Sequence, residues 1–272
     1  MKNKSLVIGI VLAILCIVCL AVGLYGPIKN KISKSNPDET VTGGDSAVTA
    51  TNPDGTPIYQ TNPDGTPAGT LTPSEIKKEE KQLSEYRAVT NDVYAMIRIP
   101  GTNIDYPVAQ NPENDNLYLR HDVDGRFSPN GTLFTEHTYN SADFSDRVTV
   151  IYGHNMTDGE MFGNLQEYYS DEATFGRYGD IYITTEGKTL HYKVFAATPY
   201  VNTHILYHYN KFPTDESVDS FLNSVYSSRE FGINIDEANK ADSSDKILVL
   251  STCLKGNYSK RFIVLAKLEE NT

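Results

Sequence analysis

The sequence of 272 residues predicts a mostly β fold, a largely antiparallel barrel with short helices, that follows an apolar anchor and a polar linker. Three observations predict it. Between residues 93 and 268 the runs rich in β-branched and aromatic residues are short, only short helical patterns separate them, and 39% of the chain is hydrophobic, which suffices for a core. A doubly wound sheet, with a long helix between successive strands, does not fit this pattern.

The N-terminal segment, residues 1–30, is predicted to be a cytoplasmic tip and a transmembrane helix. Residues 6–25 carry no charge and lie between flanking lysines, and at about 1.5 Å per residue a helix of that length crosses the hydrocarbon core of a bilayer. A cleaved signal peptide is the alternative, with Ala21-Val22-Gly23 as the cleavage site. The long acidic segment that follows predicts a single pass, with the rest of the chain outside the cell.

Residues 31–72 are predicted to be a disordered stalk. They are rich in Thr, Asn, Pro, Gly and Asp, and the sequence TNPDGTP at 51–57 recurs at 61–67. Pro-Asp-Gly is typical of turns, and nothing in the segment could bury a core. Two copies are too few for a stacked repeat, so the stalk is interpreted as a spacer.

Folded structure is predicted for residues 73–272. Thr72 and Glu75 have the spacing of a capping box with Pro73 at the first helical position, so a helix is expected over 73–92. Further helices are indicated by the apolar patterns at 161–169 and 218–225. Strands are expected at 93–99, 104–108, 132–135, 148–152, 181–185, 190–198, 247–252 and 261–268.

Charge and cysteine content exclude several classes of function. The formal net charge is −11, and residues 1–34 hold five lysines and no acid, which leaves 19 basic against 35 acidic residues in the remainder. Nucleic-acid binding rewards a basic surface, so no nucleic-acid partner is expected. Three cysteines without a CxxC pair or a Cys/His cluster argue against a disulfide framework and a zinc site, and no metal or other cofactor is expected. His204 and His208 are four residues apart, but the strand-rich context favours the wall of a groove over a metal site.

Cys253 is the only cysteine outside the apolar run, which contains Cys16 and Cys19. Outside the cell such a thiol is buried and inert, forms an intermolecular bridge, or is a reactive nucleophile. Cys253 follows the predicted strand 247–252 and precedes the polar segment Lys255-Gly256-Asn257. Strand ends that open into loops commonly display catalytic groups, so the position favours the nucleophile.

A thiol nucleophile needs a base and a cation, because only about 3% of a free cysteine is thiolate at pH 7. His154 follows the predicted strand 148–152 through Gly153, a small residue that permits close approach. Arg261 opens the predicted strand 261–268, eight residues after Cys253. Each of these residues alone is typical of a turn or a surface charge, but together, at strand ends, they predict one active site.

The motifs around these residues resemble those of class B sortases. Leu250-Ser251-Thr252-Cys253 with the later Arg261 is similar to the TLxTC signature of the sortase nucleophile strand, although Val249 stands where Thr is commonest. The sequence IYGHNM at 151–156 resembles the histidine segment of class B, and IPGTNIDYPV at 99–108 resembles its opening hairpin. Tyr118-Leu119 and GTLF at 131–134 also fit. The resemblance extends from about residue 93 to residue 268 and does not include the stalk.

The resemblance implies a sortase-like eight-stranded β-barrel and a membrane-anchored cysteine transpeptidase on the outer face of a Gram-positive cell. It implies that Cys253 attacks the Thr carbonyl of a C-terminal sorting motif, that His154 acts as acid and base, and that Arg261 holds the oxyanion or the substrate backbone. The implied partners are secreted proteins with an NPxT-like or related motif and, as acceptor, an amine of peptidoglycan or lipid II. The substrate groove is expected to include Thr252, Ser251, Leu119 and Tyr118.

Alternatives from other classes remain at this point. The chain could be a non-enzymatic, membrane-anchored surface binding module with a structural Cys253, or a sortase that polymerises pilins. A papain-like hydrolase is disfavoured, because its nucleophile comes early in the domain and on a helix, whereas Cys253 lies nineteen residues from the end of the chain.

Overall fold

The computed structural model describes residues 69–269. The strands of this part are β1 (Val93–Arg98), β2 (Asp105–Ala109), β3 (Leu133–Phe134), β4 (Val148–Tyr152), β5 (Asp180–Thr185), β6 (Lys188–Val201), β7 (Asn234–Ile235), β8 (Ile247–Leu254) and β9 (Asn257–Leu268). The helices are α2 (Pro73–Arg87), η1 (Leu117–Leu119), α3 (Leu165–Tyr169), α4 (Glu172–Phe175), η2 (Gly176–Tyr178), α5 (Ile205–His208) and α6 (Asp215–Tyr226).

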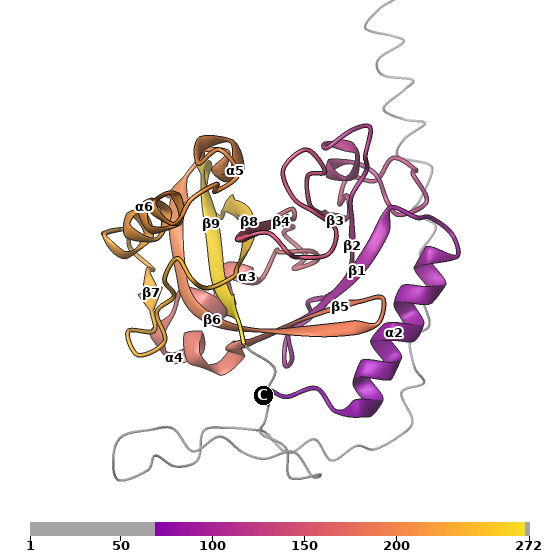
Figure 1. The fold of residues 1–272 in the computed structure, drawn as a ribbon, viewed down its shortest axis with the longest axis horizontal. Coiled ribbons are helices and arrows are strands. Elements are labelled where there is room, and N and C mark those ends of the chain that lie inside the picture. Colours follow the sequence, from indigo (N-terminus) through magenta and orange to yellow (C-terminus); the bar gives the residue numbers. More distant parts are fainter. Residues whose placement is uncertain (1–68, 270–272) are drawn as a thin grey trace, which may run out of the picture. The chain divides into compact units, whose positions relative to one another are not determined.

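The strands form a closed barrel (Figure 1). The order is β5-β1-β2-β3-β4-β8-β9-β6, and β5 also pairs with β6, so eight strands close on themselves while the short β7 adds to β6. Most neighbours are antiparallel, but β2–β3 and β4–β8 are parallel. The structure confirms the predicted mostly β fold and the eight-stranded barrel.

Three apolar clusters hold the described part together. One fills the space enclosed by the strands, with alternate residues of β8 and β9 such as Leu248, Leu250 and Val264. The residues between them, Val249 and Ile263 among others, belong to a second cluster under α5 and α6. A third cluster includes Leu83 of α2. The helix α2 lies on the side of the barrel away from α6 (Figure 1). Strand alternation therefore decides which side chains enter the barrel and which face α6.

The helix α2 begins where its sequence predicts. Thr72 accepts from Glu75 N, and the Glu75 side chain accepts from Thr72 N, which completes the capping box behind Pro73. Arg98 of β1 binds Glu75 and buried Glu79, each at 3.0 Å, so two ion pairs attach the helix to the barrel. The predicted C-terminal end at residue 92 is wrong. The helix ends at Arg87 because the chain turns back at once, with two amide groups bonded to the carbonyl of residue 86.

Three other predicted boundaries near the candidate site are wrong. Cys253 lies within β8 and Arg261 within β9, because a tight turn at Lys255-Gly256 lets the two strands pair up to Leu254 and Asn257. Gly256 has φ 81°, a conformation that glycine adopts without strain. Only 165–169 of the predicted helix 161–169 is helical, since Met161 has φ 54° and bridges Asn155.

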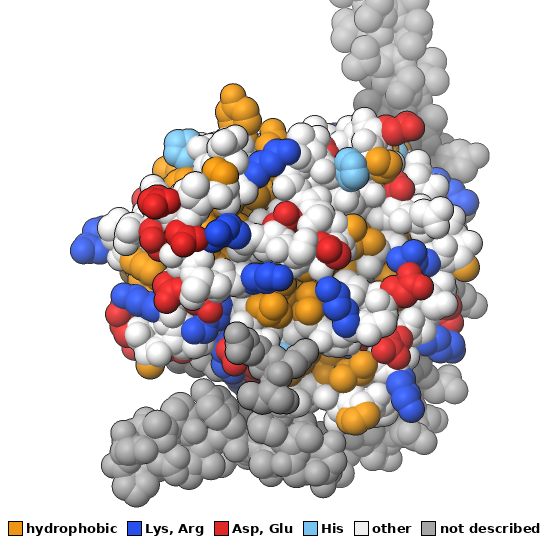
Figure 2. Space-filling view, in the orientation of Figure 1, with side chains coloured by type: hydrophobic (Ala, Val, Ile, Leu, Met, Phe, Trp, Pro, Cys, Tyr) orange, Lys and Arg blue, Asp and Glu red, His pale blue; other side chains and the backbone are white. Residues whose placement is uncertain are grey.

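The predicted anchor at 1–30 and the stalk up to residue 68 lie outside the described residues. At the end of the predicted stalk, Leu71 is already buried against the folded part. Residues 69–269 include no helix with the length and apolar character that a bilayer crossing requires. On the face drawn in Figure 2, basic and acidic side chains are interspersed, with apolar side chains between them.

Candidate active site

The hairpin of β8 and β9 brings Cys253 and Arg261 together. The two residues are partners in antiparallel register, and Arg261 Nη1 donates to Cys253 Sγ over 3.1 Å. Both side chains are half-buried, so the pair is partly shielded from water and still open to a ligand. A guanidinium in this position attracts a thiolate and any negative charge that develops beside it.

His154 lies at the same edge of the barrel as Cys253. It follows β4, which runs parallel to β8, so both strands end on the same side. Gly153 N donates to Ser251 O over 3.1 Å, and Asn155 Nδ2 donates to Cys253 O over 2.7 Å. The residues on both sides of His154 are therefore bonded to β8, which holds the backbone of His154 next to the end of that strand.

The imidazole of His154 is bonded to a third segment. Its Nε2 lies 2.7 Å from the carbonyl oxygen of Leu119 in η1. A carbonyl oxygen only accepts, so Nε2 carries the proton in this contact. A Cβ at position 153 would lie 2.6 Å from Phe162 Cδ2, so a glycine is required there for the chain to turn into the site.

A buried polar cluster adjoins Arg261. Glu136, only 8% exposed, lies 3.0 Å from His204 Nε2, and the buried hydroxyl of Tyr152 faces Glu136. Burial raises the pKa of Tyr152, Glu136 adds to the shift, and Arg261 opposes it. Burial also raises the pKa of Glu136, although His204 and Tyr152 act in the opposite direction. The positive charge of Arg261 therefore acts on the buried hydroxyl of Tyr152, which in turn faces Glu136.

Arg261 has a second hydrogen-bond partner. Its Nε donates to Asn202 Oδ1 over 2.8 Å. Asn202 directly follows β6, and Tyr200 of β6 is the register partner of Arg261 on the side away from β8. The sequence did not predict Asn202, Asn155 or Glu136 as residues of the site. The available signals were weak: Asn155 follows His154 directly, and Asn202 comes two residues before His204.

The four predicted groove residues differ in exposure. Thr252 and Ser251 are 1% and 4% exposed, Tyr118 is 3% exposed, and Leu119 is 39% exposed. Thr252 lies on the face of β8 that enters the barrel, opposite to Cys253, and its Oγ1 has no hydrogen-bond partner. The hydroxyl of Tyr118 donates to Asp92. Leu119 is thus the one of the four with an open side chain, and substrate binding by all four stays a prediction.

The turn that follows Cys253 is hydrogen-bonded to α3. Lys255 N donates to Gln166 Oε1 over 3.0 Å, and Lys255 Nζ lies 2.7 Å from Glu167 Oε1. These two contacts restrict the turn between Cys253 and Arg261. The register that pairs the two residues is therefore supported from outside the hairpin as well as by the strand pairing.

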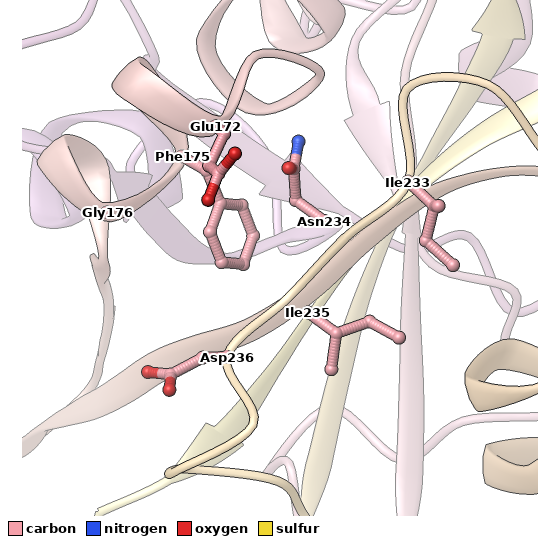
Figure 3. A pocket seen from close by; sticks show the side chains of 7 residues that line it. All are labelled: Glu172, Phe175, Gly176, Ile233, Asn234, Ile235 and Asp236. Atoms are coloured by element: carbon pink, nitrogen blue, oxygen red, sulfur yellow. The ribbon is translucent and has the colours of Figure 1, made fainter.

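One hollow of the described part lies away from these residues. It encloses about 460 Å³ between α4 and β7, and none of the predicted site residues lines it (Figure 3). Its walls combine acidic and apolar side chains from Glu172, Phe175, Gly176, Ile233, Asn234, Ile235 and Asp236. Among the described residues no group of three His, Cys, Asp or Glu side chains is placed to hold a metal ion.

Comparison with known proteins assigns the family and the fold. The family model of the sortase domain matches residues 97–269, which include the three predicted catalytic residues. The chain belongs to the sortase family. The match begins within β1 and ends just after β9, so it spans all the strands of the barrel.

The relatives of this sortase are of class B. It is 29% identical over 204 residues to sortase B of Listeria monocytogenes, covering 74% of this chain and 78% of that protein. The solved structure of sortase B of Clostridium perfringens matches with a TM-score of 0.60 and 27% identity, over 69% of this chain and 99% of that one. A class B sortase of Streptococcus pyogenes involved in pilus biogenesis matches with a TM-score of 0.60 and 26% identity, over 69% and 98% of the two chains.

Membership in the family decides between the classes of function left open by the sequence. This sortase is a cysteine transpeptidase, its matched relatives are of class B, and the alternative of a non-enzymatic binding module is set aside. The three predicted catalytic residues converge on one edge of the barrel, with Cys253 and Arg261 in contact and His154 at the adjoining strand end. Their individual roles stay predictions.

Proposed function

We propose that this sortase cleaves secreted proteins after the threonine of a C-terminal sorting motif, NPxT-like or related, and transfers the new acyl group to an amine of peptidoglycan or lipid II. The observation that supports the proposal best is the 3.1 Å contact between Arg261 Nη1 and Cys253 Sγ, beside the strand end that carries His154. A thiol, a cation and an imidazole at one edge suit acyl transfer through a thioester.

The reaction proceeds in two halves. The thiolate of Cys253 adds to the Thr carbonyl, and the negative charge on the oxygen is stabilised by Arg261. The C–N bond then breaks, the leaving amine takes a proton from the imidazolium of His154, and a thioester remains. In the second half an amine adds to the thioester carbonyl and loses its proton to His154. The C–S bond breaks and the thiolate is restored, so no oxidant, reductant or cofactor is consumed.

The proposal predicts a thioester that an amine discharges. The full-length protein is incubated with a panel of sorting peptides that includes NPxT-like sequences, with and without a peptidoglycan-type amine. Intact-mass measurement is expected to show an acyl adduct on the protein, and chromatography a peptide–amine product when the acceptor is present. No adduct and no product with any peptide of the panel would contradict the proposal.

The identity of the amine acceptor distinguishes anchoring of proteins to the cell wall from polymerisation of pilins. The second function is worth testing because the class B sortase of Streptococcus pyogenes, involved in pilus biogenesis, matches this chain as well as the Clostridium perfringens structure does, with a TM-score of 0.60 for each. A peptide that carries a lysine side chain therefore belongs in the same assay. Faster discharge by the lysine peptide than by the peptidoglycan-type amine would favour a pilin acceptor.

We also propose that residues 6–25 anchor the protein in the cell membrane as a single pass, with the catalytic domain outside. The support is the uncharged run in the sequence and the long acidic segment after it. In fractionated cells the full-length protein is expected in the membrane, and protease added to intact cells is expected to cut it. Replacement of residues 6–25 by an unrelated apolar helix of equal length should preserve this behaviour. An N-terminus found near residue 22 in the mature protein would show a cleaved signal peptide instead.

A further inference from the structure

The guanidinium of Arg261 is held from two directions. Nη1 faces Cys253 Sγ at 3.1 Å, and Nε donates to Asn202 Oδ1 at 2.8 Å. The partners come from segments far apart in the chain, since Asn202 is 59 residues before Arg261 and Cys253 is 8 residues before it. An arginine side chain has several rotatable bonds, and two such contacts leave it little freedom to turn.

The two contacts of Arg261, with Cys253 and with Asn202, change differently during the proposed reaction. The sulfur of Cys253 loses its negative charge as soon as it forms the bond to the substrate carbon, so its attraction for the guanidinium falls at that moment. The amide oxygen of Asn202 takes no part in the chemistry and keeps its bond throughout. Asn202 uses only the Nε hydrogen of Arg261, so the hydrogens on Nη1 and Nη2 stay available for the substrate oxygen.

The segment that carries Asn202 is itself fastened. His204, two residues later, accepts from Tyr207 N with Nδ1 at 3.1 Å, so its Nε2 carries the proton and donates to Glu136 at 3.0 Å. The ring of His204 also packs against Tyr139, with the ring centroids 4.7 Å apart. Because Glu136 is buried, the contact ties the chain after β6 to the body of the protein close to Arg261.

We propose that Asn202 is a positioning residue that holds Arg261 in place for the oxyanion, with the contact between His204 and Glu136 fixing the segment on which Asn202 lies. The inference rests on the role proposed above for Arg261. Asn202 does not touch the reacting atoms in this scheme, and its effect passes entirely through the guanidinium.

The inference is tested by kinetics of the full-length protein with the peptide that the panel shows to be cleaved fastest. Asn202→Ala is expected to lower kcat about 10- to 100-fold, the cost of losing one hydrogen bond to a charged group, with KM nearly unchanged. Asn202→Asp keeps an acceptor oxygen and should recover most of the loss. Asn223→Ala, at an exposed position of α6, is the matched control and should behave as the wild type.

A second experiment, in the Arg261→Met variant, distinguishes a positioning role of Asn202 from direct binding of the substrate by Asn202. In Arg261→Met, which has no donor, Asn202→Ala should cause no further loss of the rate of thioester formation, measured by intact mass. A loss as large as in the wild-type background, a change confined to KM, or a wild-type kcat for Asn202→Ala would overturn the inference. If Arg261→Met itself keeps the wild-type rate, the role proposed for Arg261 fails instead, so the two failures are distinguishable.

Discussion

Replacement of Cys253 by alanine is expected to abolish acyl transfer and leave the barrel folded. The change removes the sulfur atom proposed to form the thioester, and loss of a nucleophile from a catalytic set lowers kcat by about 10⁴-fold or more. Cys253 is half-buried and lies outside the apolar clusters, so removal of its sulfur leaves the core untouched. The measurements are peptide cleavage, peptide–amine formation and thermal unfolding, with Tm expected to stay close to that of the wild type.

The other cysteines provide the control for this experiment. The double variant Cys16→Ala/Cys19→Ala removes both remaining thiols of the chain and should keep full activity. In that variant a charged thiol reagent is expected to label Cys253, since the side chain is partly exposed, and to inactivate the enzyme. Unchanged peptide transfer by the Cys253→Ala protein would end the interpretation of Cys253 as the nucleophile.

Replacement of Arg261 by lysine is expected to lower kcat about 10²- to 10³-fold although the positive charge is kept. The loss of one donor to a developing oxyanion has an effect of this size. A lysine presents a single nitrogen, so it cannot contact Asn202 and Cys253 as the planar guanidinium does, with Nε at 2.8 Å and Nη1 at 3.1 Å. Steady-state kinetics should place the loss in kcat, with little change in KM.

An arginine elsewhere on the surface provides a control for the replacement of Arg261 by lysine. Arg126 pairs with Asp124 at an exposed position, and Arg126→Lys preserves charge in the same way. That variant should keep the wild-type kcat. Near-normal kcat for Arg261→Lys would contradict the role of Arg261 in binding the oxyanion. The contribution of Arg261 would then be its positive charge and not the geometry of its guanidinium.

Local sequence patterns were sufficient for much of the fold. The capping box predicted the first residue of α2, and the apolar residues at 218–225 predicted α6, because both depend on contacts within one or two turns. The strand 148–152 was predicted with its observed bounds. The predicted ends of the strands around Cys253 and Arg261 were wrong, because pairing across a tight turn extends strands into residues such as Asn257 and Lys260 that have little strand preference of their own.

The sequence alone nominated Cys253, His154 and Arg261, since residue type and the apolar runs beside each residue are local properties. Only the tertiary structure decided their partners: the parallel pairing of β4 with β8, the Leu119 carbonyl on His154, and Asn202 on Arg261. These depend on strand register and on closure of the barrel, where a shift of one residue moves a side chain to the other face. The same alternation placed Thr252 inside the barrel and Cys253 outside it. The sequence LSTC alone does not show which of the two side chains faces the interior.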